Sequence, residues 1–128
     1  MKIIELPVYK AGEVIEAWRI FYWHVGIVSE RWVDGEQVIL SCSCQQNMVV
    51  EERMSKFSLG FPVQRKDIPC TLNTEEVLAR ARSKLGHAYD IFRWNCEHFV
   101  YYSLGLEPKS PQLALAALTV ISWIATAK

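Results

Sequence analysis

The sequence predicts an α+β fold in which an antiparallel sheet from the N-terminal half packs against helices from the C-terminal half. Two observations support this prediction. Residues 13–65 consist of short runs rich in Val, Ile and aromatic residues, separated by turn signals such as Asp34-Gly35. From Asn73 onward, apolar residues recur at helical spacing instead. Strands that precede the helices, rather than alternating with them, are typical of α+β proteins.

Five strands are expected in the first half, at residues 13–21, 22–29, 37–44, 48–52 and 61–65. The second is apolar along nearly its whole length, which is typical of a strand buried on both faces. Pro62 predicts that the fifth lies at an edge, because proline cannot donate a backbone hydrogen bond to a neighbouring strand. Residues 54–57 are expected to form a short helical turn.

Two helices are expected between Asn73 and Gly105. Asn73 begins one of them as an N-cap, with Glu76 three residues later, and Gly86 ends it. Asn95 caps a shorter helix over residues 96–104, which is followed by a glycine. Both boundaries follow from the capping chemistry of asparagine and glycine.

Composition limits the possible functions. At 128 residues and 51% hydrophobic, the chain is one globular domain with a sizeable core. Its 14 basic and 14 acidic residues balance and form no basic tract, so nucleic acid is not an expected partner. Glu5 and Pro7 interrupt the N-terminus before a signal-peptide core could form, so a cytoplasmic location with reduced cysteines is expected.

Cys96 is the candidate nucleophile. It lies in the first turn of the helix predicted after Asn95, where unpaired N–H groups and the helix dipole stabilise an anion. Such a position lowers a thiol pKa and can supply donors to an oxyanion. The alternative is a small buried hydrophobe. Cys42-Ser43-Cys44 lacks the ligand spacing of a zinc site, so no metal and no cofactor are expected.

His24 is the candidate base among three histidines. It lies in an apolar strand, where an imidazole needs a partner. On a helix, His98 would point about 200° away from Cys96, so a surface or hydrogen-bonded structural role is expected for it. His87 lies in a turn and is expected to be solvated. Cys96 and His24 together suggest a Cys–His dyad joined across the fold, with a satisfied core histidine as the alternative.

Residues 95–99, Asn-Cys-Glu-His-Phe, resemble the NC-box of lecithin:retinol acyltransferase-like (LRAT-like) domains. The similarity continues to Ser110-Pro111-Gln112, and residues 22–28 resemble the H-box of the same family. The resemblance covers most of residues 7–112 and implies a permuted papain-like fold, in which the histidine precedes the cysteine. It divides the chain into an LRAT-like domain, residues 1–112, and an apolar C-terminal helix, residues 113–128.

The resemblance implies cysteine-dependent acyl transfer or hydrolysis, of the phospholipase or acyltransferase type, on a glycerophospholipid acyl chain. His24 would take the proton from Cys96, and the thiolate would attack an ester or amide carbonyl. The resulting thioester would pass the acyl group to water or to an acceptor alcohol or amine. Tyr22, predicted on the same strand face as His24, is a candidate hydrogen-bond donor to the oxyanion or substrate, or else an aromatic wall.

The third catalytic group, which orients the base, is not found at its expected place. Aligning Asp34-Gly35 with the turn of the family places Leu40 where a second histidine is common. Leucine cannot orient an imidazole, although Ser41 or Gln37 could hydrogen-bond the ring. The two boxes favour an enzyme, whereas Leu40 favours a non-catalytic protein that acts by protein or membrane association. Some picornavirus 2A proteins carry the same boxes and fit that alternative.

The C-terminal segment carries no charge from Leu113 to Ala127, and Ser110-Pro111 is a strong helix start. At about 1.5 Å per residue the segment would span roughly 22 Å, against a hydrocarbon core of about 30 Å. It could pack over the sheet as a core helix, lie in a membrane interface, or be buried in a partner chain. Some family members carry an apolar C-terminal anchor. The expected partners are therefore a lipid or acyl substrate and a membrane surface.

Overall fold

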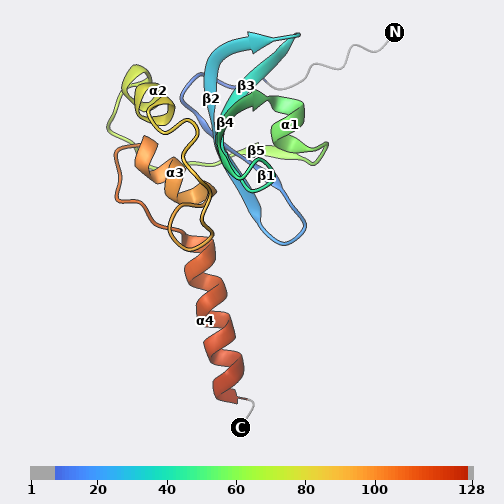
Figure 1. Cartoon of the computed structure of the whole chain (residues 1–128), viewed down its shortest axis with the longest axis vertical. Helices are drawn as coiled ribbons and strands as arrows, with labels where there is room; N and C mark the ends of the chain where they lie inside the picture. Colours follow the sequence, from blue (N-terminus) through green and yellow to red (C-terminus); the bar gives the residue numbers. More distant parts are fainter. Residues whose placement is uncertain (1–7, 127–128) are drawn as a thin grey trace.

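A computed structural model describes residues 8–126, so Glu5 and Pro7, which bear on the expected location, lie outside the described residues. The centre is a five-stranded antiparallel sheet in the order β4-β3-β2-β1-β5 (Figure 1). Its strands are β1 (Val14–Trp18), β2 (Trp23–Val33), β3 (Glu36–Ser43), β4 (Met48–Arg53) and β5 (Val63–Arg65). The helices are α1 (Met54–Ser58), α2 (Thr74–Arg82), α3 (Cys96–Ser103) and α4 (Pro111–Thr126). The predicted α+β architecture is confirmed.

Side chains alternate along β2 between two cores, one on each face of the sheet. Val25 and Ile27 belong to the core that α2 and α3 cover, together with Leu40, Cys42, Cys96 and Phe99. Val28 belongs to the other core, which α1 covers, together with Ile15, Ala17, Ile39 and Phe57. Gly26 lies on the α1 face without room for a side chain, because a Cβ there would be 2.7 Å from a ring carbon of Phe57.

Most predicted boundaries hold to within a few residues. The first strand ends at Trp18 rather than at residue 21, because Ile20 adopts a left-handed φ of 74° that no strand accommodates. The fifth strand lies at the edge of the sheet, as Pro62 predicts. The side chain of Asn73 accepts a hydrogen bond from Glu76 N at 2.9 Å, so the predicted N-cap of α2 is confirmed.

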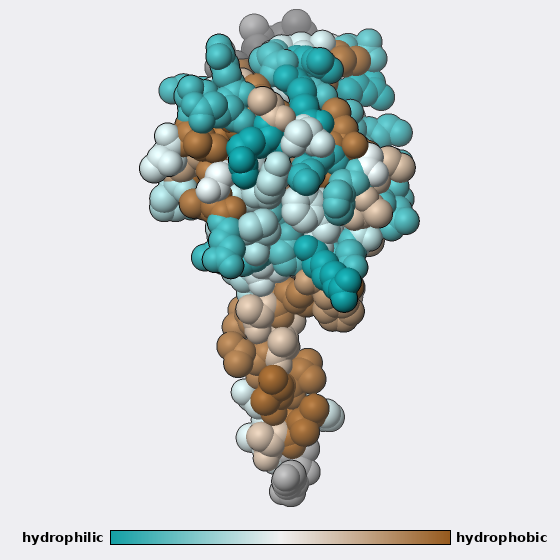
Figure 2. Space-filling view, turned by 60° about the vertical axis from the view of Figure 1, so that its left-hand side comes forward, coloured by the Kyte–Doolittle hydropathy of each residue, from teal (hydrophilic) through white to brown (hydrophobic). Residues whose placement is uncertain are grey.

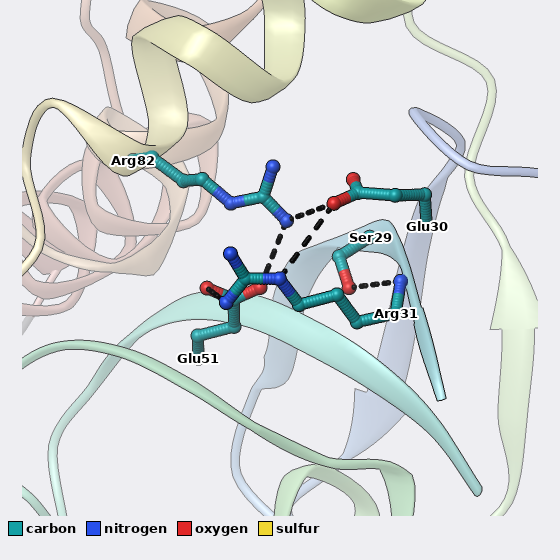
Figure 3. Close-up of polar contacts among 5 residues, drawn as sticks. All are labelled: Ser29, Glu30, Arg31, Glu51 and Arg82. Atoms are coloured by element: carbon teal, nitrogen blue, oxygen red, sulfur yellow. Dashed lines mark hydrogen bonds and ion pairs between the residues drawn. The ribbon is translucent and has the colours of Figure 1, made fainter. Parts of the chain in front are cut away.

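A network of charges fastens α2 to the sheet (Figure 3). The guanidinium of Arg82 points between two carboxylates, at 2.6 Å from Glu30 on β2 and 3.0 Å from Glu51 on β4. Arg31 contacts the other carboxylate oxygen of Glu51 at 3.4 Å. Because these groups are partly exposed, we expect their contribution to stability to be small, and their main effect to be positional.

The C-terminal helix α4 extends away from the rest of the molecule (Figure 1). It begins at Pro111, as predicted, and none of the side chains described in Pro111–Thr126 is buried. The alternative of a core helix packed over the sheet does not match this arrangement, because the described part of α4 leaves its side chains unburied and bonds to the sheet at its base, where Gln112 meets Trp23. Within residues 8–126, no helix has both the length and the apolarity needed to cross a bilayer.

Candidate functional site

Cys96 begins α3, as the sequence predicts, and the helix start is closed by its own capping residues. The side chain of Asn95 accepts hydrogen bonds from Glu97 N at 2.9 Å and His98 N at 3.3 Å. In return, Nδ1 of His98 accepts from Asn95 N at 2.9 Å, which completes a capping box. His98 is therefore the hydrogen-bonded structural group expected from its spacing. Two of the N–H groups expected to hold an oxyanion are already occupied by Asn95.

The thiol of Cys96 is buried against the sheet. The residue is 6% exposed, and its Sγ lies 4.0 Å from the carbonyl oxygen of Trp23 on β2. Burial raises the pKa of Cys96 to about 11, although backbone N–H groups of Val25, Glu97 and Cys96 itself favour the thiolate. The predicted lowering of this pKa is wrong, because desolvation of the anion outweighs the helix N-terminus.

His24 lies on the other face of the sheet. Its cross-strand partner on β1 is Ala17, a member of the α1-side core, and its ring packs on Phe57 with centroids 4.8 Å apart. The residue is 2% exposed. Burial, and then the positive charge of Arg19, lower the pKa of His24 to about 3. The imidazole is therefore neutral and a weak base at physiological pH.

The structure brings the two predicted catalytic residues to the same point of β2 but does not join their side chains. The sulfur of Cys96 lies against the backbone on either side of His24, while the imidazole projects through the opposite face. The raised pKa of the thiol and the lowered pKa of the imidazole both oppose transfer of a proton from Cys96 to His24. The predicted contact between the two is therefore wrong in this conformation.

The other predicted site residues, Tyr22, Gln37 and Ser41, are also not joined to His24 in the predicted way. Tyr22 precedes β2 and packs against the core that contains Cys96, rather than sharing a face with His24. Gln37 is committed to a pair of hydrogen bonds with the backbone of Tyr9, at 3.0 and 2.7 Å, so it does not orient the ring. Ser41 is buried, and its hydroxyl has no hydrogen-bond partner among the described residues, His24 included.

A polar network that sequence reasoning missed joins α3, α4 and β2. The carboxylate of Glu97 accepts from the Ser110 hydroxyl at 2.7 Å and from Gln112 N at 2.8 Å. The side chain of Gln112 in turn accepts from Trp23 N at 2.8 Å and donates to Trp23 O at 2.8 Å. The similarity of residues 110–112 to the family was the available signal. The network holds the base of α4 against the segment of β2 that covers Cys96.

Two surface cavities, of about 220 and about 420 Å³, lie away from Cys96 and His24. The smaller lies between the β1–β5 edge and α2, and its lining includes Glu13, Lys66 and Leu72. The larger lies over β3 and β4, beside Arg31 and Lys56. Neither cavity is lined by a predicted catalytic residue.

A comparison with protein families matches residues 7–105 to the family described as Lecithin retinol acyltransferase. The match covers more than three quarters of the 128-residue chain and includes both the strand of His24 and the helix of Cys96. A comparison with curated proteins finds no match.

Proposed function

This chain belongs to the lecithin retinol acyltransferase family, and from that premise we propose that it is a non-catalytic member that acts by associating with a membrane. Membership is compatible with acyl transfer or hydrolysis. The observation that carries the proposal is the placement of Cys96 and His24 on opposite faces of β2. A sealed thiol and a separated imidazole lack the hydrogen-bonded geometry that nucleophilic catalysis requires.

The distribution of apolar side chains around α4 supports a lipid rather than a protein partner. At 100° per residue, its six exposed large apolar side chains point in all directions around the axis: Leu115, Leu118, Val120, Ile121, Trp123 and Ile124. A helix that packs against one partner helix needs only a single apolar stripe, whereas hydrocarbon surrounds a helix on every side. The hydroxyls of Thr119 and Thr126 donate to carbonyls within α4, which suits an apolar environment.

The second candidate function is acyl transfer or hydrolysis through Cys96. Two observations favour it: family membership, and the location of the thiol at the N-terminus of α3. The same chemistry would require the imidazole of His24 to cross to the other face of β2, or another group to accept the proton. It would also require the thiol to be uncovered.

Acylation of Cys96 separates the two candidates. We expect that the folded full-length protein, incubated with labelled phospholipid vesicles, forms no acyl adduct on Cys96 in peptide-resolved mass spectrometry. Cys96→Ala is the blank, and Cys44→Ala controls for non-specific acylation, because Cys44 is an exposed thiol. An adduct on Cys96 that survives in Cys44→Ala would overturn the non-catalytic proposal and establish the thioester mechanism.

A further inference from the structure

Phe21 and Phe92 are the two most exposed large apolar side chains among the described residues, at 92% and 73%. Phe21 lies in the turn between β1 and β2, beside Ile20, which is 59% exposed. Phe92 lies in the loop before α3, beside Ile91, which is 52% exposed. We call these four residues the apolar loop pair. Each loop presents two adjacent apolar side chains to solvent, which a soluble surface does not need.

Hydrogen bonds hold both loops against the base of α4. The turn that carries Phe21 leads into Trp23, whose backbone N–H and C=O both bond to the side chain of Gln112 at 2.8 Å. In the other loop, Asn95 Nδ2 donates to Ile91 O at 3.0 Å and to the hydroxyl of Ser110 at 3.0 Å. The apolar loop pair and the first turn of α4 therefore share one end of the molecule.

Apolar surface gathers at this end of the molecule (Figure 2). Figure 2 shows apolar surface that runs from the lower end of the domain onto α4, whereas the upper part of the visible face is mainly polar. In Figure 1, the β1–β2 turn lies at the end from which α4 emerges, and the β2–β3 hairpin lies at the opposite end. The β1–β2 turn and the base of α4 thus lie at the end of the molecule where apolar surface gathers (Figures 1 and 2).

The backbone of Ile20 favours a specific role for its turn. Its φ of 74° lies in the left-handed region, which glycine and asparagine occupy readily and a β-branched residue does not. Such a conformation is strained for a β-branched residue and persists only where the surrounding structure enforces it. Here it directs two adjacent apolar side chains, Ile20 and Phe21, into solvent.

We infer that the apolar loop pair inserts into a phospholipid bilayer alongside α4, so that the domain sits on the membrane in a fixed orientation. This inference rests on the proposed membrane association and adds a second contact to it. A bilayer is the occupant that also suits the apolar circumference of α4. The orientation would place the Cys96 end of the fold next to lipid, because Gln112 holds the same Trp23 carbonyl that lies 4.0 Å from Cys96 Sγ.

Vesicle binding by loop variants tests the inference. The full-length chain carrying Phe21→Ser and Phe92→Ser, with α4 intact, should bind neutral phosphatidylcholine vesicles at least about tenfold more weakly than wild type in flotation assays. The matched control carries Trp32→Ser and Val33→Ser at the β2–β3 hairpin. Those side chains are 54% and 45% exposed but lie at the opposite end, so binding should be unchanged.

A photo-crosslinking measurement does not depend on how well the serine variant folds. Benzoylphenylalanine at position 21 or 92 should form lipid adducts on vesicles, and the same group at position 32 should not. Wild-type binding by the loop variant, with no lipid adduct at 21 or 92, would overturn the inference and leave α4 as the sole contact. Crosslinks to a second copy of the chain would also overturn it. Absence of vesicle binding by the wild type would overturn both this inference and the proposed membrane association.

Discussion

His24→Leu should make the protein more resistant to acid than the wild type. The imidazole has a pKa of about 3 in the folded state, against 6.5 when free, so the unfolded chain binds a proton that the folded chain excludes. Stability that is fully present above pH 6.5 is therefore lost as the pH falls toward 3. Between pH 7 and pH 4.5 the wild type should lose roughly 2–3 kcal/mol from this group alone.

Urea unfolding at the two pH values measures this effect. His24→Leu keeps an apolar side chain against Phe57 but removes the titrating group. The loss of unfolding free energy between pH 7 and pH 4.5 should therefore be smaller in this variant by the contribution of His24. His87→Leu is the matched control, because it removes an imidazole from an exposed position rather than from the core. If His24 were instead paired with a thiolate, its pKa would be raised and acid would not weaken the fold through it. A wild-type-like acid drop in His24→Leu would therefore contradict the described environment.

Leu118→Asp combined with Val120→Asp should abolish membrane association through α4. The two side chains are 61% and 56% exposed and, at 100° per residue, point to nearly opposite sides of the helix, so any bilayer-embedded orientation buries at least one aspartate. A carboxylate in hydrocarbon costs about 2.5–3.5 kcal/mol per residue, so vesicle binding should weaken about a hundredfold or more. Since neither side chain is buried in the protein, the urea midpoint of the domain should not move.

Flotation with neutral vesicles measures the loss, and Trp32→Asp with Val33→Asp serves as the control. The control adds the same charge at the hairpin opposite α4 and should bind like wild type. Unchanged binding by the α4 variant would remove this helix from the membrane contact. A change from oligomer to monomer in vesicle-free solution would identify a partner chain, rather than lipid, as what covers α4.

Local sequence patterns predicted the elements of this fold well, because their causes are local. The Asp34-Gly35 turn, the Asn73 and Asn95 caps and the Ser110-Pro111 helix start each depend on residues a few positions apart. Family resemblance added the position of the cysteine helix relative to the histidine strand. The resemblance implied a Cys96–His24 dyad, whereas the structure places the sulfur of Cys96 4.0 Å from the Trp23 carbonyl on β2 and the imidazole of His24 against Phe57.

The details of the site could not be predicted, because they depend on contacts between distant residues. Side chains alternate along a strand, so an uncertainty of one residue in register decides which face His24 takes. The direction of the Cys96 pKa depends on how completely the sheet covers the thiol, which no helix-start signal reveals. Likewise, the bonds from Gln112 to Trp23 connect residues 89 positions apart.

The central claim is that Cys96 is a sealed, unactivated thiol on the face of β2 that His24 does not share. The alkylation rate of each cysteine by iodoacetamide, resolved by peptide mass spectrometry between pH 6 and pH 8, tests it most directly. Exposed Cys44 and Cys70 provide the internal reference. We predict that Cys96 reacts at least about tenfold more slowly than either, because both its burial and its raised pKa suppress the thiolate. Alkylation of Cys96 ahead of both exposed thiols in the native protein would contradict the claim.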